Sequence, residues 1–144
     1  MKTLGAKFEY TTERNADLMR VYHEAICLAK QIYMPDVFRT IVNQPSARFW
    51  VSEERASVVI SSMFRGGGIG HMTPQKQEMY REIFRRVLDL KRLHPRKRLS
   101  QLVCRVVVQP APKFYLTPGS AQVIVSRVKN QWYRTRRPRH HRSS

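Results

Sequence analysis

A nine-residue string that occurs twice constrains the fold of this chain more than any other feature of its sequence. "QPSARFWVS" occupies residues 44–52 and returns as "QPAPKFYLT" at residues 109–117, 65 residues later. The similarity continues without gaps, since "VFRTIVNQPSARFWVSEERASVVIS" (37–61) aligns with "LVCRVVVQPAPKFYLTPGSAQVIVS" (102–126). Self-similarity at a fixed spacing indicates a structural unit that is used more than once. We therefore interpret the chain as a tandem duplication of a unit of about 65 residues.

The first copy has the apolar spacing of helices. A stripe at three- and four-residue steps predicts a long amphipathic helix and contains Leu18, Tyr22, Ala25, Ala29 and Ile32. A short second helix is expected over residues 36–43. Ser52 is a good N-cap for a third helix, because its hydroxyl can accept a hydrogen bond from an unpaired backbone N–H of the first turn.

The second copy repeats this plan. Thr73 is expected to cap a helix whose first residue is Pro74, a favourable first residue because proline has no N–H to leave unpaired. "HPRKR" (94–98) then forms a turn, and a short helix with Ser100 as its cap leads to the second string. A last helix is expected to start with Thr117 as its cap, followed by Pro118, and to run to about residue 134.

Alternation with a period of two is sustained nowhere, so little or no β-sheet is expected. The predicted fold is all-α, with two tandem helical units of helix-turn-helix character. Unit one is expected at residues 1–65, a glycine-rich linker at 66–72, unit two at 73–134 and a disordered basic tail at 135–144.

The charge of the chain indicates what kind of partner it meets. The sequence holds 27 Lys and Arg against 10 Asp and Glu, a net charge of +17. Such a charge favours polyanions, which are nucleic acids or acidic membrane surfaces. Asp89 is the last acidic residue, and residues 90–144 hold 14 Lys or Arg, whereas residues 1–89 hold the other 13 together with all 10 acids. The surface that faces a polyanion is therefore expected in unit two.

Several classes of protein are not indicated. Cys27 and Cys104 make no disulfide framework and are interpreted as reduced core residues of a cytoplasmic protein. Such a protein would be associated with the nucleoid in a bacterium, or part of the virion if a phage encodes it. No segment approaches the roughly 18 apolar residues of a membrane span, and the start of the chain lacks the apolar run of a signal peptide. Neither metal-ligand spacing nor a catalytic constellation is present, so no metal, cofactor or enzymatic activity is expected.

The order of predicted elements is similar to that of a known family. A long helix, a short helix, a tight turn, one or two helical turns ending in aromatics and a capped helix resemble the DNA-binding headpiece of tetracycline-repressor-type regulators. The matching segments are Asn43-Gln44 or Val108-Gln109 as the turn, and 45–51 or 110–116 as the recognition helix. The resemblance implies a helix-turn-helix that places this short helix in the major groove. The large ligand-binding domain of those regulators is absent, so a drug-sensing role does not carry over.

The candidate site follows from this resemblance and from the charge. Lys113 and Tyr115 are expected at the DNA interface, while Phe114 and Leu116 hold the fold. Further contacts are expected around the second string, in the tail and at one position of the first string, namely Arg96, Lys97, Arg98, Arg127, Lys129, Arg134, Arg136, Arg137, Arg139 and Arg48. In the simpler alternative, the aromatics of both strings are core residues at a chain reversal, and Arg48 and Lys113 are solvated charges.

Three hypotheses of function remain. The favoured one is a small basic protein that binds duplex DNA as a transcriptional regulator or accessory factor. A structural or packaging protein of a virion or nucleoid would use the same charge without sequence choice. An RNA-binding protein would stack unpaired bases on the aromatics of "KFY" and "RFW". Unit one, which carries less net charge, is expected to contact a protein partner or a second copy of the chain. In the alternative, both units bind one duplex in tandem.

Overall fold

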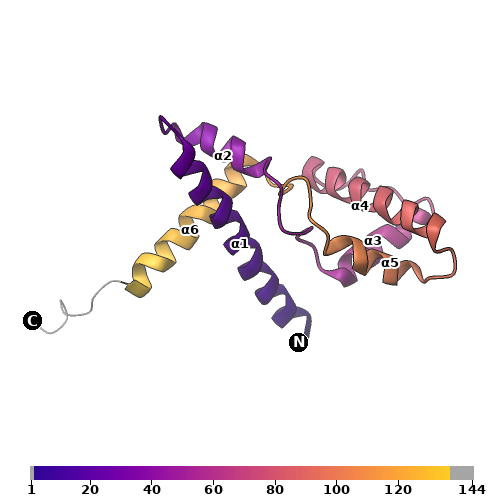
Figure 1. The fold of residues 1–144 in the computed structure, drawn as a ribbon. Coiled ribbons are helices and arrows are strands. Elements are labelled where there is room, and N and C mark those ends of the chain that lie inside the picture. Colours follow the sequence, from indigo (N-terminus) through magenta and orange to yellow (C-terminus); the bar gives the residue numbers. More distant parts are fainter. Residues whose placement is uncertain (1, 137–144) are drawn as a thin grey trace, which may run out of the picture.

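The computed structural model describes the backbone of residues 2–136 and the side chains of residues 10–132 and 134. Six helices make up the described chain: α1 (Lys2–Leu28), α2 (Met34–Val42), α3 (Glu53–Phe64), α4 (Pro74–Leu93), α5 (Leu99–Val107) and α6 (Pro118–Arg136) (Figure 1). Between residues 2 and 136 there is no strand, only one isolated antiparallel bridge from Ser46 to Ala111. The predicted all-α class is confirmed. The predicted tail lies outside the described residues, except that α6 continues to Arg136.

The helices pack in two groups that do not follow the order of the chain. Helices α1, α2 and α6 pack on one another, and α3, α4 and α5 form the second group (Figure 1). The third helix of each half of the sequence therefore packs with the first two helices of the other half. The two predicted units, divided at residues 66–72, therefore stay a prediction from the sequence repeat. In the structure, each group of packed helices draws on both sides of that division.

Each group encloses its own hydrophobic cluster. In the α1–α2–α6 group the buried side chains are Leu18, Val21, Tyr22, Val37, Phe38, Ile41, Val42, Phe114, Ala121 and Val125. In the α3–α4–α5 group they include Phe49, Val59, Ile60, Tyr80, Ile83, Val87, Leu102, Val103, Val106, Val107 and Tyr115. The α3–α4–α5 cluster thus contains Phe49 of the first string, and the α1–α2–α6 cluster contains Phe114 of the second string. Burial of such large rings contributes strongly to the stability of a core.

Local sequence explains where most helices begin. The hydroxyls of Ser52, Thr73 and Thr117 accept hydrogen bonds from backbone N–H groups of the following turn, at 3.1, 3.3 and 3.0 Å, so these predicted caps are confirmed. The prediction that Ser100 caps the short helix is wrong, because α5 begins at Leu99 and its N-cap residue is Arg98.

The long first helix ends earlier than its apolar stripe predicted. Helix α1 stops at Leu28, and Ile32 lies outside it with 56% of its surface exposed. The chain must reverse within residues 29–33 so that α2 packs back on α1, and no side chain at this turn is carried into the core. The expectation that Ile32 belongs to the core stripe is therefore wrong.

The two repeated strings form the connections between the groups. In the first connection (residues 43–52) and the second (108–117), Ser46 N donates to Ala111 O at 3.0 Å and Ala111 N donates to Ser46 O at 3.1 Å. Phe49 N donates to Val107 O, the last residue of α5, and Phe114 N donates to Val42 O, the last residue of α2, each at 3.0 Å. The helical turns expected at 45–51 and 110–116 are not formed, because these backbone groups pair across the connections instead of with their own chain.

The two adjacent aromatics of each string face different hydrophobic clusters. In the first connection Phe49 lies in the α3–α4–α5 cluster, and the next residue, Trp50, packs on the other cluster. In the second connection Phe114 lies in the α1–α2–α6 cluster, and the next residue, Tyr115, lies in the α3–α4–α5 cluster. Each string therefore supplies one ring to each hydrophobic core.

A charged side chain of a long helix anchors each connection. The buried carboxylate of Asp17 on α1 accepts from Ala47 N at 2.7 Å and from Trp50 Nε1 at 3.1 Å. The residue at the place of Ala47 in the second string is Pro112, which has no N–H to donate. There Arg86 on α4 donates instead, to Pro110 O at 3.0 Å.

Replacing Phe49 or Phe114 by alanine should lower the free energy of unfolding by about 3–5 kcal/mol in each case, because each ring fills a closed cluster. The matched controls are Val58→Ala and Val123→Ala on the exposed faces of α3 and α6, which should change stability by no more than about 0.5 kcal/mol. Urea unfolding measures all four. A loss below about 1 kcal/mol in either Phe variant would show that its ring does not hold its cluster together.

Candidate nucleic-acid interface

The outer face of α6 carries a stripe of polar side chains. Ala121 and Val125 on the inner face are buried against α1 and α2. The outer face exposes residues at steps of three and four: Arg127, Asn130, Gln131 and Arg134. Residues with this spacing share one face of a helix, so the four side chains form a continuous surface, here called the α6 stripe. The helix runs from α2 away from the α3–α4–α5 group (yellow in Figure 1).

No acidic residue lies on α6, since Asp89 is the last one in the sequence. Asp89 is itself engaged, with Oδ2 3.6 Å from Arg85 and Oδ1 3.7 Å from Arg92. Among the described residues, no carboxylate pairs with Arg127 or Arg134. The predicted contacts Arg127 and Arg134 thus lie together on the α6 stripe.

Sequence reasoning missed the two amides of the stripe. Asn130 and Gln131 lie between Arg127 and Arg134 on the same exposed face. The i, i+3, i+4, i+7 spacing of Arg and amide side chains in residues 127–134 was a signal that could have identified them.

Other predicted residues of this region lie off the stripe. Lys129 faces α1, where its Nζ donates to the Tyr22 hydroxyl at 3.2 Å and lies 5.3 Å from the centre of the Tyr22 ring. Arg136 belongs to α6, but its side chain lies outside the described part of the chain, as do Arg137 and Arg139 entirely.

The two basic residues of the strings are held by contacts inside the protein. Lys113 Nζ lies 2.6 Å from the Glu78 carboxylate on α4. The Arg48 guanidinium lies over the rings of Tyr10 and Trp50, at 4.9 and 5.5 Å from their centres. Arg48 also donates to the backbone carbonyl of Phe49 at 3.1 Å. Arg48 and Lys113 therefore brace the connections, and the structure does not bring them to the α6 stripe.

Tyr115, expected to face DNA, is a buried residue. Its ring stacks on Phe49 with centres 6.0 Å apart, and its φ of 57° lies in the left-handed region that is unusual for an aromatic residue. Burial raises the pKa of Tyr115 to about 12. Its position matches the alternative in which the aromatics of the strings are core residues.

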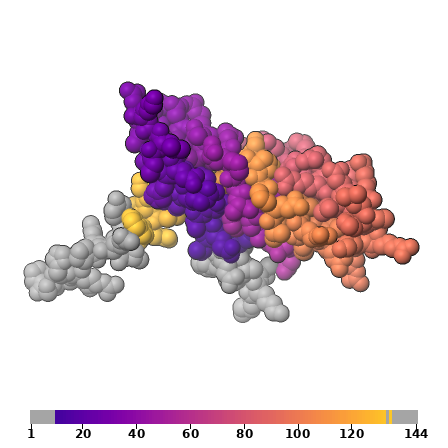
Figure 2. Space-filling view, viewed as in Figure 1, coloured from indigo at the N-terminus to yellow at the C-terminus, as the bar shows by residue number. Residues whose placement is uncertain are grey.

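Three predicted contacts form a separate cationic surface. Arg96, Lys97 and Arg98 are all exposed on the turn between α4 and α5, here called the basic turn. This turn lies at the right-hand end of the molecule in Figure 2, whereas α6 extends to the left. The structure therefore divides the predicted nucleic-acid contacts between two ends of the molecule.

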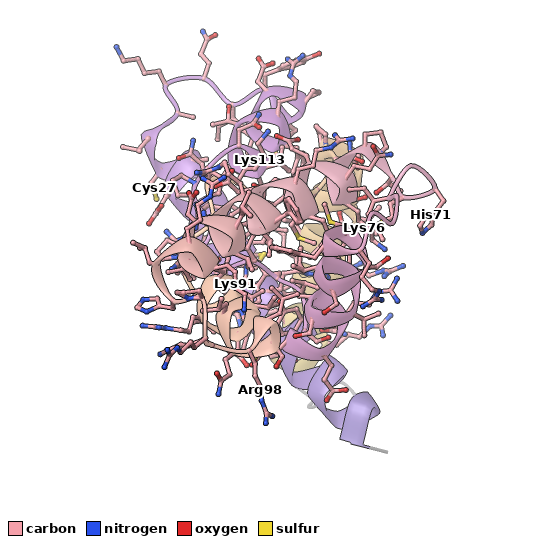
Figure 3. The ribbon with its side chains drawn as sticks, turned by 90° about the vertical axis from the view of Figure 1, so that its right-hand side faces the viewer. Cys27, His71, Lys76, Lys91, Arg98 and Lys113 are labelled. Carbon is pink, nitrogen blue, oxygen red and sulfur yellow. The ribbon has the colours of Figure 1, made fainter. Side chains whose placement is uncertain are left out.

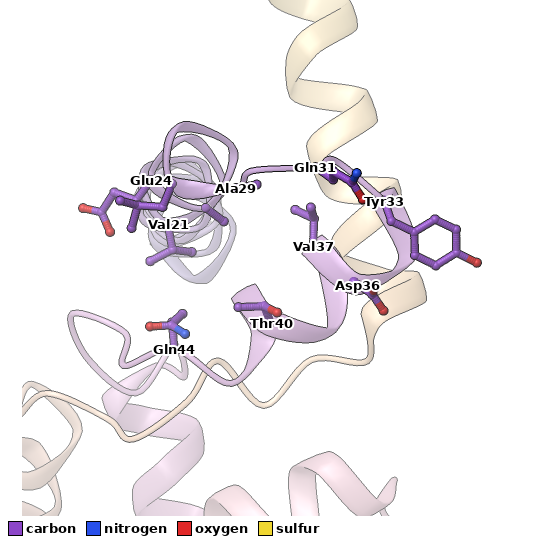
Figure 4. Close-up of a pocket in the computed structure, with 11 residues that line it drawn as sticks. Val21, Glu24, Ala29, Gln31, Tyr33, Asp36, Val37, Thr40 and Gln44 are labelled. Atoms are coloured by element: carbon purple, nitrogen blue, oxygen red, sulfur yellow. The ribbon is translucent and has the colours of Figure 1, made fainter.

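The corresponding turn of the first half exposes apolar side chains. Leu28, the last residue of α1, is exposed by 83%, and Ile32 and Tyr33 in the turn are exposed by 56% and 62%. Beside them lies a groove of about 350 Å³ whose lining includes Val21 and Val37 (Figure 4). The expected contact of unit one with a protein partner stays a prediction. This groove is one exposed surface at which such a partner would fit.

Both cysteines differ from expectation in their location. Cys27 and Cys104 are free, as expected for reduced residues, but both are exposed on the outer faces of α1 and α5. The expectation that they belong to the core is therefore wrong. Across the described residues, no group of three His, Cys, Asp or Glu side chains could hold a metal ion.

No family model, no curated protein and no solved structure matches this chain. None of the helices in the described part is long and apolar enough to cross a lipid bilayer. The α6 stripe and the basic turn must therefore be interpreted from their own chemistry.

Replacing Tyr115 by phenylalanine should reduce the loss of stability at alkaline pH. Above pH 10 the phenol ionises in the unfolded chain before it does so in the folded protein, where the pKa is about 12, so the wild type loses stability as the pH rises from 10 to 12. Urea unfolding between pH 9 and 12 measures this loss. The control variant Tyr33→Phe, at a site 62% exposed, should lose as much stability as the wild type. Identical pH profiles for Tyr115→Phe and the wild type would contradict burial of the hydroxyl.

Proposed function

We propose that the protein binds duplex DNA through the α6 stripe. The observation that carries the proposal is the exposed row of Arg127, Asn130, Gln131 and Arg134, on a helix without acidic residues. The inner face of the same helix is packed against α1 and α2, so the stripe is presented by a supported element.

The residue types of the α6 stripe suit the edges of base pairs. Arginine can donate two hydrogen bonds to guanine, and asparagine or glutamine can pair with adenine in the same bidentate way. Arg127 and Arg134 are seven residues apart, about 10 Å along a helix axis. That distance covers roughly three base-pair steps, which suits a helix in the major groove.

The charge of the whole chain supports the same conclusion. A net charge of +17 attracts a duplex before specific contacts form, and lysines and arginines release counterions when they meet phosphates. With base-reading residues on α6, the protein would act as a transcriptional regulator or accessory factor. This proposal does not depend on a recognition helix in the strings.

The test begins with selection of bound sequences from random DNA and RNA pools, followed by binding of the selected duplex to Asn130→Ala and Arg127→Ala. Each variant should lose about 1–3 kcal/mol of discrimination between the selected duplex and a random one if its side chain meets a base. Gln122→Ala, an exposed change nearer the start of α6, is the control and should bind like the wild type.

The same measurements separate the rival hypotheses. An equal loss on every duplex, with the salt slope of log affinity reduced by about 0.9 in Arg127→Ala, would mean phosphate contacts only and would favour a packaging protein. Selection of single-stranded RNA instead of duplex DNA would favour the RNA-binding hypothesis. Wild-type affinity and slope in both variants would exclude the α6 stripe as the interface.

A further inference from the structure

The basic turn is a second exposed cationic surface, at a distance from the α6 stripe. Arg96, Lys97 and Arg98 are consecutive, and none of them pairs with a carboxylate among the described residues. The turn contains no acidic residue, and the nearest one in the sequence, Asp89, is engaged with Arg85 and Arg92 on α4. The positive charge of this turn is therefore not neutralised within the described structure.

The backbone of the basic turn is held by hydrogen bonds, which leaves its side chains directed outward. Lys91 Nζ donates to Lys97 O at 2.7 Å, and Lys97 N donates to His94 O at 3.1 Å. Arg98 N donates to Gln101 Oε1 at 3.3 Å, which closes the start of α5. Figure 3 shows Arg98 pointing away from the body of the protein. A fixed backbone reduces the entropy lost when these side chains bind a ligand.

A turn in the same chain shows that the three cations are not needed for folding. The turn between α1 and α2 lies 65 residues earlier and has the same place between a long and a nine-residue helix. At the positions of the three cations it carries Gln31, Ile32 and Tyr33. Since this turn forms without cations at these three positions, the charge of the basic turn calls for an explanation other than folding.

The two cationic surfaces lie on elements at opposite ends of the molecule. The α6 stripe belongs to the α1–α2–α6 group, and the basic turn lies at the far end of the α3–α4–α5 group, with the body of that group between them (Figure 1). A duplex held at the α6 stripe meets the end of the molecule that is far from the basic turn, so the turn stays available to another polyanion.

We propose that the basic turn binds the phosphates of a second duplex, so that one molecule bridges two DNA segments. This inference rests on the proposed function of the α6 stripe. Lysine and arginine that meet phosphates position DNA without reading its sequence, so the second contact needs no sequence choice. A charged turn at the tip of two packed helices can approach a phosphate backbone without entering a groove.

The experiment measures capture of a fluorescent duplex by the full-length protein bound to a bead-tethered duplex, beside the affinity for one short duplex in solution. The test variant is Arg96→Ala, Lys97→Ala and Arg98→Ala combined. The control removes the same charge from three other exposed positions, Lys30→Ala, Arg65→Ala and Lys76→Ala. Circular dichroism establishes that both variants are folded, and sedimentation at the assay concentration establishes the number of chains per complex.

The wild type and the control should capture the second duplex, whereas the test variant should capture about tenfold less and keep its affinity for one short duplex within about threefold. Unchanged capture by the test variant would overturn the bridging proposal, as would an equal loss in the control. If the test variant loses as much affinity for one short duplex as it loses capture of the second, the bridging proposal is overturned too. The turn would then contact the same duplex as α6. If the wild type does not bind the tethered duplex at all, the proposed function itself fails.

Discussion

The pairing of the two connections is the constraint on which the rest of the structure depends. Ser46 and Ala111 exchange two backbone hydrogen bonds, and Phe49 and Phe114 each donate to the last residue of the short helix in the other half. These bonds satisfy backbone groups that would otherwise be left unpaired where the chain leaves one group and enters the other. Each string also places one aromatic in each hydrophobic cluster, so the two groups are joined by backbone pairing and by packing together.

The charged anchors on the long helices reinforce this junction. Asp17 holds Ala47 and Trp50 against α1, and Arg86 holds Pro110 against α4. Because Pro112 has no N–H, the second connection could not use the carboxylate anchor of the first, and a guanidinium that donates to a carbonyl takes its place. Asp17 is buried with its oxygens occupied, so these contacts hold the junction rather than offering a site for a ligand.

The exchange of third helices decides where the cationic surfaces lie. Had α6 packed on α4 and α5, its stripe and the basic turn would belong to one group of helices. Because α6 packs on α1 and α2, the two surfaces are separated by the α3–α4–α5 group. This separation is the basis for proposing that the basic turn makes a second, sequence-independent phosphate contact beside the base recognition proposed for α6.

The sequence by itself determined the helical class, the caps at Ser52, Thr73 and Thr117, the recurrence of the two strings and the concentration of charge after Asp89. These properties depend on neighbouring residues and on composition, so a linear pattern reports them. Only the tertiary structure decided that the strings form no helical turn, that Tyr115 is buried and that Lys113 is paired with Glu78. The reason is that the partners of these groups lie far away in the sequence: a proline and two aromatics suit a helical turn or a non-helical crossing equally well, and hydrogen bonds to the carbonyls of distant residues select the crossing.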